Sequence, residues 1–339
     1  MTNLLSDEEI NYRHNKEKNL VNIFKSFEKP IDFIWIDKNS RRRLVFQVDN
    51  NHNFGFFQEK SHKLNIVDNC EIAEKSINDL LPSLKKFLKN ISTKLLKQIV
   101  VTNFDNGLDL VFRYIESPSS QDEKQLIDFA KSQNLVLSLQ INSSIFPIYL
   151  PRKNQIYCGD YKLIVDSDIF IQATKKGLEN IVNILRKTLD DNQAKKIAEL
   201  YCGCGIYSFT LLDLNRQFEC FEGSESMIKI IKNNVKNFNI NQKITPFVRD
   251  LYNNPLSVKE LNIFDNVIIN PPRNGAEPQI ANIAKSKVKN VQYVSCNPIS
   301  LVRDAKILVD EKYNISNITA IDQFYSTMHN EIIISFEKI

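Results

Sequence analysis

The chain has 339 residues, of which 42% are hydrophobic and 25% charged, as in an ordinary globular protein. This length predicts two domains, because single hydrophobic cores rarely grow far beyond about 250 to 300 residues. The beginning, MTNLLSDEEINYRHNKEK, is charged where a signal peptide would be apolar, and no apolar run of about 18 residues occurs anywhere. Export and membrane insertion are therefore not expected, and a net charge of +4 favours polyanionic partners only slightly.

The six cysteines are scattered along the chain, with neither a disulfide framework nor paired Cys-x-x-Cys spacing. This distribution predicts a reducing compartment, the cytoplasm, and no bound metal. Oligomeric state leaves no signal in the sequence, so a monomer is the default expectation.

Residues 31–165 contain short apolar segments rich in β-branched and aromatic residues, which predict a mostly antiparallel sheet. Two segments have helical spacing, EIAEKSINDLLPSLKKFLKNISTKLL and SSQDEKQLIDFAKSQN. Ser120, followed three residues later by Glu123, can cap the second helix. An α+β domain over residues 1–168 is the prediction.

Two basic segments of this half are candidates for contacts with nucleic acid. NSRRRLVF contains Arg41, Arg42 and Arg43, and FGFFQEKSHKL interleaves aromatic residues with Lys60, His62 and Lys63. Such a mixture can stack on bases and contact phosphates. A solvated strand end followed by half-buried aromatic residues would look the same, so the segment alone does not decide.

From residue 169 onwards, helical and strand segments alternate. Strands are expected at 195–202, 218–223, 243–248, 264–270 and 290–296 with two more at the end, and helices at 177–189, after Gly205, and at 224–238, 279–286 and 299–310. This alternation predicts a mainly parallel, doubly wound α/β sheet over residues 169–339, with ligands outside the carboxyl ends of its strands.

The first strand end of this half carries ELYCGCGIYS. Gly203 and Gly205 allow a tight turn and the close approach of a cofactor, and Glu222 ends the next strand, where a carboxylate can bind two ribose hydroxyls. Ser208 stands where a dinucleotide fingerprint would have a third glycine, so S-adenosylmethionine fits better than NAD. The alternative is a helix-start turn beside a surface glutamate. Asp250, after the following strand, can contact an adenine amino group or cap a helix.

Two further strand ends carry Asn270 in VIINPPRNG and Cys296 in VQYVSCNP. Paired prolines stop strand pairing and stiffen the loop, so a flat base can be held against it. A strand-end cysteine is most often a small buried hydrophobe. A methyl-donor site, a stiff loop and a thiol on adjacent strand ends instead suggest one constellation.

These motifs, in this order, resemble those of the RNA (uracil-5-)methyltransferases that act on transfer and ribosomal RNA. The resemblance rests on FIQAT, ELYCGCG, FEG, INPPRNG, YVSCNP, LVRDAKIL and DQFYSTMHNEIIISF, and is looser in the N-terminal half. It implies S-adenosylmethionine as cofactor, a Rossmann-like catalytic domain, an N-terminal RNA-recognition domain, and formation of 5-methyluridine in an RNA loop. A base in such a loop leaves its stack at the least cost.

The resemblance implies two catalytic residues. Cys296 corresponds to the thiolate that adds to carbon 6 of uracil, and Glu331, in MHNEII, to the base that removes the proton from carbon 5. A free thiol with a pKa of about 8.5 is only slightly ionised at neutral pH, so Arg273 and the positive sulfonium are expected to favour the thiolate.

The resemblance also implies binding residues. Gln172, Tyr201, Glu222 and Asn270 correspond to cofactor positions, joined by Gly203, Gly205 and Asp250 from the strand-end argument. Substrate contacts are expected from Phe170, which can stack near the base, and from Arg273, with phosphate contacts by Arg41, Arg42, Arg43 and Lys63. Arg303 and Asp304 are expected to be structural or phosphate-facing.

Two departures from the family's pattern matter. Asn270 stands where the family usually has aspartate, so weaker cofactor binding or slower turnover is expected. Residues 1–69 contain no cysteine for the iron-sulfur cluster of many members, and RRRL at residue 41 leaves no room for an N-terminal β-barrel module. Two other functions remain open, an amino-group methyltransferase that uses the Asn-Pro-Pro-Arg loop and an inactive RNA-binding homologue.

Overall fold

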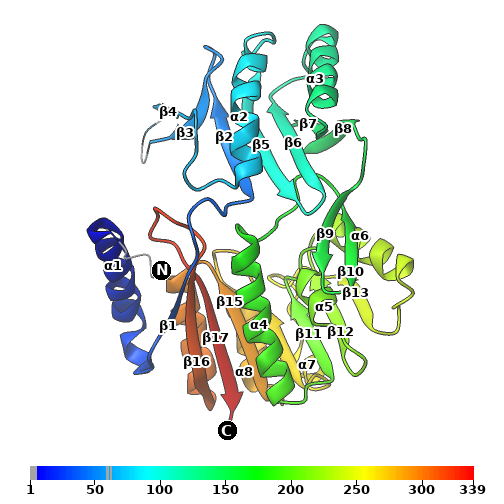
Figure 1. Cartoon of the computed structure of the whole chain (residues 1–339). Helices are drawn as coiled ribbons and strands as arrows, with labels where there is room; N and C mark the ends of the chain where they lie inside the picture. Colours follow the sequence, from blue (N-terminus) through cyan, green and yellow to red (C-terminus); the bar gives the residue numbers. More distant parts are fainter. Residues whose placement is uncertain (1–5, 59–60, 62) are drawn as a thin grey trace. The chain divides into compact units, whose positions relative to one another are not determined.

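The computed structural model describes residues 6–58, 61 and 63–339. It forms two compact units (Figure 1). The C-terminal unit combines the chain up to Ile36 with Glu179–Ile339, and the central unit contains Asp37–Leu178. The boundary after Leu178 lies ten residues beyond the predicted one at 168/169, and the first described residues belong to the C-terminal unit.

The C-terminal unit is built on an eight-stranded sheet with the strand order β1-β16-β17-β15-β14-β11-β12-β13. The strands are β1 Asp32–Trp35, β11 Lys196–Leu200, β12 Gln217–Glu222, β13 Ile244–Val248, β14 Asn266–Ile269, β15 Asn290–Ser295, β16 Tyr313–Asp322 and β17 Glu331–Lys338. All neighbours pair in parallel except β17, which is antiparallel to both β15 and β16. The predicted mainly parallel α/β sheet is confirmed.

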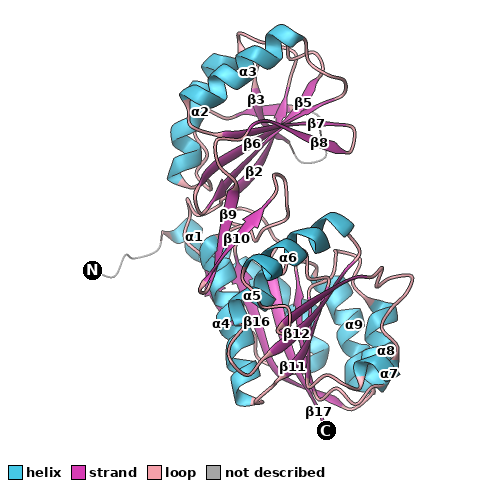
Figure 2. Cartoon of the chain, turned by 90° about the vertical axis from the view of Figure 1, so that its right-hand side faces the viewer, coloured by secondary structure: helices cyan, strands magenta, loops and turns pink. Residues whose placement is uncertain are grey.

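Helices cover both faces of this sheet, with α4 on one face and α8 and α9 on the other (Figure 2). The helices are α1 Asp7–Phe24, α4 Lys175–Asp191, α5 Ile206–Leu211, α6 Glu225–Asn237, α7 Val258–Leu261, α8 Glu277–Lys285 and α9 Pro298–Asp310. β14 is buried along its whole length, as expected for a central parallel strand covered on both faces.

Helix α1 was not predicted from the sequence. Ser6 caps it by accepting a hydrogen bond from the Glu9 amide at 3.3 Å, and its buried Leu20 and Phe24 join the core of the C-terminal unit. The chain then passes through a short 3-10 turn, Lys25–Phe27, into β1, which pairs in parallel with β16 at the edge of the sheet. The start of the chain therefore completes the C-terminal unit.

The central unit contains a seven-stranded sheet with the order β4-β3-β2-β5-β6-β7-β8. Its strands are β2 Arg43–Val48, β3 Phe54–Phe57, β4 Leu64–Ile66, β5 Leu96–Phe104, β6 Gly107–Tyr114, β7 Val136–Ile141 and β8 Ser144–Tyr149. Only β6 and β7 pair in parallel, so the sheet is mostly antiparallel, as predicted. A separate hairpin, β9 Asn154–Cys158 and β10 Tyr161–Val165, follows.

Two helices pack on this sheet, α2 Lys75–Leu88 and α3 Ser120–Ser132. The first is shorter than its helical spacing predicted, because β5 begins at Leu96. The cap of α3 lies one residue before the predicted Ser120: Ser119 accepts the amide of Asp122 at 3.1 Å. In the described part of the chain, no helix combines the length and apolarity needed to cross a membrane.

Candidate active site

The turn after β11 lies at the carboxyl edge of the C-terminal sheet. Gly203 and Gly205 adopt left-handed backbone with φ of 55° and 81°, and a side chain at Gly205 would approach Ile231 at 3.2 Å. At Gly203 an added Cβ would meet no atom within 4 Å, so open space adjoins this backbone. Tyr201 also has positive φ, of 57°, a strained conformation that is typical of functional turns.

Two carboxylates predicted for the cofactor lie at the next strand ends. The half-buried Glu222 accepts hydrogen bonds from the amides of Gly203 at 3.1 Å and Ser224 at 3.0 Å, so its side chain is fixed beside the glycine turn. Asp250 instead accepts from the amides of Tyr252 and Asn253 and from the Asn253 side chain, and these bonds lower its pKa. Asp250 therefore organises its own turn.

Glu199, inside β11, was missed by the sequence analysis. It is buried and accepts the amide of Ser208 at 2.9 Å, within the helix that follows the glycine turn. Burial raises the pKa of Glu199 to about 8, although the bonds from Ser208 oppose this shift. Ser208, which stands in place of a third glycine, is thus hydrogen-bonded to β11. The sequence did offer a signal for Glu199, an acidic residue inside the apolar strand that precedes the glycine turn.

Asn270 follows β14 directly and is anchored at both its backbone and its side chain. Its amide donates to the Leu200 carbonyl at 3.2 Å, and its Nδ2 donates to the Tyr207 hydroxyl at 3.3 Å. A neutral amide that donates to a tyrosine hydroxyl therefore occupies the position at which the family's aspartate was expected.

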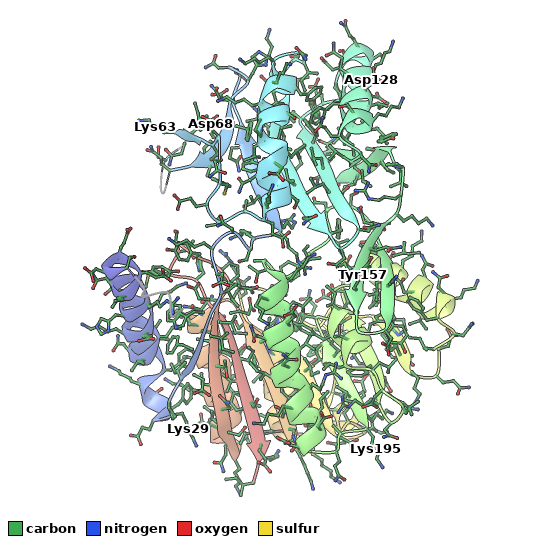
Figure 3. The ribbon with its side chains drawn as sticks, viewed as in Figure 1. Lys29, Lys63, Asp68, Asp128, Tyr157 and Lys195 are labelled. Carbon is green, nitrogen blue, oxygen red and sulfur yellow. The ribbon has the colours of Figure 1, made fainter. Side chains whose placement is uncertain are left out.

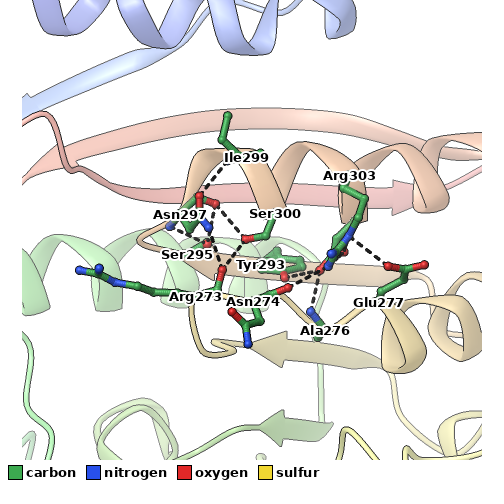
Figure 4. A network of polar contacts seen from close by, with 11 residues as sticks. Arg273, Asn274, Ala276, Glu277, Tyr293, Ser295, Asn297, Ile299, Ser300 and Arg303 are labelled. Atoms are coloured by element: carbon green, nitrogen blue, oxygen red, sulfur yellow. Dashed lines mark hydrogen bonds and ion pairs between the residues drawn. The ribbon is translucent and has the colours of Figure 1, made fainter.

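The loop after Asn270 is joined to the turn after β15. The Arg273 carbonyl accepts hydrogen bonds from Asn297 Nδ2 at 2.8 Å and Ser300 Oγ at 3.0 Å. Asn297 also caps α9, since its Oδ1 accepts the amide of Ile299 at 3.1 Å. Figure 4 shows the Arg273 side chain extending away from this network. The two loops therefore form one fixed platform.

Cys296 follows the last residue of β15, and Glu331 is the first residue of β17. The antiparallel pairing of these strands ends at Ser295 and Ile332, so Cys296 and Glu331 both adjoin this last pair. The thiol is half-buried, and burial and the Glu331 carboxylate raise its pKa, whereas Arg273 lowers it. The charged groups of Glu331 and Arg273 are thus close enough to the Cys296 thiol to shift its pKa.

The Glu331 carboxylate is held by Gln323, another residue that the sequence analysis missed. Gln323 Nε2 donates to Glu331 Oε2 at 2.9 Å, and both side chains are buried. Burial raises the pKa of Glu331 to about 7, and the Gln323 bond opposes this rise. A carboxyl with a pKa near neutrality is suited to exchange protons.

Arg303 and Asp304 have structural contacts. The buried Asp304 accepts hydrogen bonds from the Ala276 amide at 2.7 Å and the Tyr293 hydroxyl at 2.6 Å. Arg303 binds Asp304 at 2.7 Å and the Asn274 carbonyl at 3.0 Å (Figure 4). Both residues support the loop that carries Arg273, in agreement with the structural alternative.

The predicted residues of the central unit differ in exposure. Arg42 is buried and donates to the Gln172 carbonyl at 3.1 Å, and Arg43 forms an ion pair with Asp168 at 2.6 Å. The predicted phosphate contact is therefore corrected for Arg42, whose guanidinium group is buried, whereas for the half-buried Arg43 it stays a prediction. Arg41 is half-buried and donates to the Arg43 carbonyl at 3.1 Å.

Lys63 and Phe170 are exposed in the central unit, Phe170 by 67%, whereas Gln172 is buried (Figure 3 for Lys63). Lys63 follows a segment of which Lys60 and His62 lie outside the described residues. Among the residues with described positions, no group of three or more His, Cys, Asp or Glu side chains could hold a metal ion.

A model of the tRNA (uracil-5-)methyltransferase family matches residues 10–339. Among similar proteins, 23S rRNA (uracil(1939)-C(5))-methyltransferase RlmD of Haemophilus influenzae strain 86-028NP is 33% identical over 307 residues, covering 89% of this chain and 67% of that protein. An uncharacterised RNA methyltransferase of Mesorhizobium japonicum is 30% identical, with 96% of this chain and 79% of that protein covered. The chain thus spans about two thirds of the length of its RlmD relatives.

The fold is also similar to a solved structure. The tRNA (uracil-54, C5)-methyltransferase of Pyrococcus abyssi, in complex with S-adenosyl-L-homocysteine, matches with a TM-score of 0.74 and 22% identity, covering 95% of this chain and 81% of that one. Since the family model extends over nearly the whole sequence, the chain belongs to the tRNA (uracil-5-)methyltransferase family of S-adenosylmethionine-dependent enzymes.

Proposed function

We propose that this protein transfers a methyl group to carbon 5 of a uridine in structured RNA, through a covalent bond between Cys296 and carbon 6. The observation that carries the proposal is the end of the β15–β17 pairing at Ser295 and Ile332, where a half-buried thiol lies close enough to a buried carboxyl of raised pKa for the carboxylate to raise the pKa of the thiol. Relatives named for methylation of ribosomal and transfer RNA support RNA as the substrate class.

The residues at the carboxyl edge fit S-adenosylmethionine. Open space adjoins the Gly203 backbone, the Glu222 carboxylate is fixed beside it, and the buried Tyr201 hydroxyl has no hydrogen-bond partner among the described residues. Glu222 retains acceptor capacity for ribose hydroxyls beyond the two amides that it binds. When bound, the cofactor supplies an electrophilic methyl group on a positively charged sulfur.

Cys296 begins the reaction as a nucleophile. Its thiolate adds to carbon 6 of uracil, the carbon-sulfur bond forms, and the electron pair of the ring double bond moves towards the oxygen on carbon 4. Carbon 5 then becomes nucleophilic and forms a bond to the methyl group, while the bond between that methyl group and the sulfonium sulfur breaks and its electron pair stays on the sulfur. Because burial and Glu331 raise the pKa of the thiol, Arg273 has the task of favouring the thiolate.

Glu331 completes the reaction as the base. Its carboxylate takes the proton from carbon 5, the ring double bond reforms, and the bond between carbon 6 and the Cys296 sulfur breaks to release the thiolate. Gln323, which donates to Oε2, orients the carboxylate and favours its charged form. The carboxyl of Glu331 is therefore protonated at the end of the turnover.

The test uses RNA that contains 5-fluorouridine, incubated with the protein and S-adenosylmethionine. Because fluorine on carbon 5 cannot be removed as a proton, the wild-type protein is expected to remain covalently bound to the RNA, whereas Cys296→Ala forms no adduct. An amino-group methyltransferase or an inactive homologue would give no adduct with wild type. An adduct that persists in Cys296→Ala would exclude Cys296 as the nucleophile.

A further inference from the structure

Helix α1 is attached to Asp322, the last residue of β16, from which the chain leads to β17. Lys16 Nζ donates to Asp322 Oδ1 at 2.5 Å, and the Tyr12 hydroxyl donates to Oδ2 at 2.9 Å. The side chain of Lys16 is 0% exposed and that of Asp322 3%, so this ion pair is shielded from water. Removal of one partner would leave an uncompensated buried charge, which makes this attachment hard to replace.

Further contacts continue along the same segment. Asp322 Oδ1 also accepts the amide of Phe324 at 3.3 Å, and the Tyr12 hydroxyl lies 3.5 Å from the Thr327 carbonyl. The rings of Tyr12 and Tyr325 contact each other with centroids 5.1 Å apart. Helix α1 therefore fixes the first half of the segment that leads into Glu331.

The attachment is one residue away from the group that holds the base. Gln323 follows Asp322 and donates to Glu331 Oε2 at 2.9 Å. Glu331 in turn precedes Ile332, which pairs with Ser295, the neighbour of Cys296. A shift of Asp322 would move Gln323 and hence the carboxylate, and a misplacement of about 1 Å can slow a reaction about 100-fold.

We propose that Lys16 and Tyr12 are positioning residues for proton abstraction. By fixing both oxygens of Asp322, they place Gln323 so that the Glu331 carboxylate faces carbon 5 of the covalent adduct. The inference rests on the proposed uracil-5 mechanism and extends it: α1 serves the elimination step, and formation of the adduct and transfer of the methyl group do not depend on it.

The experiment is a single turnover with RNA carrying tritium on carbon 5 of uridine and carbon-14 in the methyl group of S-adenosylmethionine. It measures methyl incorporation, tritium release and the protein-RNA adduct that survives denaturation. In Lys16→Met, tritium release is expected to slow about tenfold or more. Methyl incorporation is expected to change less than about twofold, so the methylated adduct accumulates, as in Glu331→Gln.

Tyr12→Phe tests the same attachment with less risk to folding. It keeps the ring beside Tyr325 but removes the hydrogen bond to Asp322, so the same pattern is expected at about threefold. Arg216→Met is the control, because it removes another buried basic side chain and its ion pair, here with the exposed Asp190, at the amino end of β12 and thus at the opposite edge of the sheet. No adduct should accumulate in this control.

The possible results distinguish failure of the positioning role from failure of the proposed function. Equal slowing of methyl incorporation and tritium release in Tyr12→Phe and Lys16→Met, or adduct accumulation in Arg216→Met, would overturn the positioning role. If Lys16→Met does not fold, Tyr12→Phe decides alone. Wild-type protein that neither methylates RNA nor forms an adduct with 5-fluorouridine RNA would instead contradict the proposed function.

Discussion

The carboxyl edge of the C-terminal sheet and the arginine-rich start of β2 both carry polar side chains, but these side chains have different partners. At the carboxyl edge, backbone amides and neighbouring loops hold the polar groups in place, and the Cys296 thiol remains half-buried. At β2, the guanidinium groups of Arg42 and Arg43 bind the Gln172 carbonyl and the Asp168 carboxylate.

The difference between the two regions indicates which features of a site can be predicted from the sequence. A residue at the end of a parallel strand reaches the same edge as its neighbours whatever its side chain, because topology fixes that position. A basic residue in a strand binds whichever acceptor the tertiary structure places near it. Four experiments test this contrast, and they are ordered from the largest expected effect to the smallest.

The largest effect is expected at the carboxyl edge, for Glu331→Gln. The amide keeps the size of the side chain but cannot accept the proton, so tritium release from carbon 5 should fall by about 100- to 10,000-fold. The covalent adduct with Cys296 should accumulate. Glu337→Gln, an exposed position on the same strand, is the control and should retain normal release. Full activity of Glu331→Gln would show that another group is the base.

The second prediction distinguishes an arginine that stabilises the central unit from a lysine that contacts RNA. Arg42→Met leaves the buried Gln172 carbonyl without this donor, so the free energy of unfolding in urea should fall by about 2 kcal/mol. Lys63→Met should leave stability unchanged but reduce the slope of log affinity for RNA against log salt by about 1. The opposite assignment, a stable Arg42→Met with a reduced salt slope, would restore the phosphate role of Arg42.

The third effect is a shift in pH dependence. Burial raises the pKa of Glu331 to about 7, and the hydrogen bond from Gln323 lowers it, so Gln323→Met should raise the pKa further. The base must be ionised, so the rising limb of tritium release against pH moves to higher pH. A shift of one pKa unit would slow release about tenfold below pH 7 and little above pH 9. An equal loss at every pH would contradict this account.

The smallest effect is expected for Asn270→Asp. A carboxylate at this position restores the negative charge of the family's motif near the sulfonium, so turnover should rise by about threefold, an effect below 1 kcal/mol. The measurement is kcat and KM for S-adenosylmethionine. Tyr207→Phe is the control, because it removes the hydrogen bond with Asn270 at 3.3 Å without adding charge. Unchanged kinetics in Asn270→Asp would show that the amide is no handicap.

The sequence by itself determined the alternating order of the C-terminal sheet and the polar residues at its strand ends. Apolar runs with a regular period specify strands and helices locally, so the positions of Glu222, Asn270 and Cys296 followed from their places after such runs. Helix α1 was not predicted from the sequence because its apolar residues form only a weak stripe along a mostly polar segment.

Only the tertiary structure decided which of these groups meet. β17 runs antiparallel between β15 and β16, and this placement brings Glu331 to the end of β15 that Cys296 follows and within hydrogen-bonding distance of Gln323. It also decided that β1 joins the C-terminal sheet and that Arg42 is buried. The physical reason is that pairing between distant strands and burial of a charge depend on surfaces far apart in the sequence, which local periodicity does not encode.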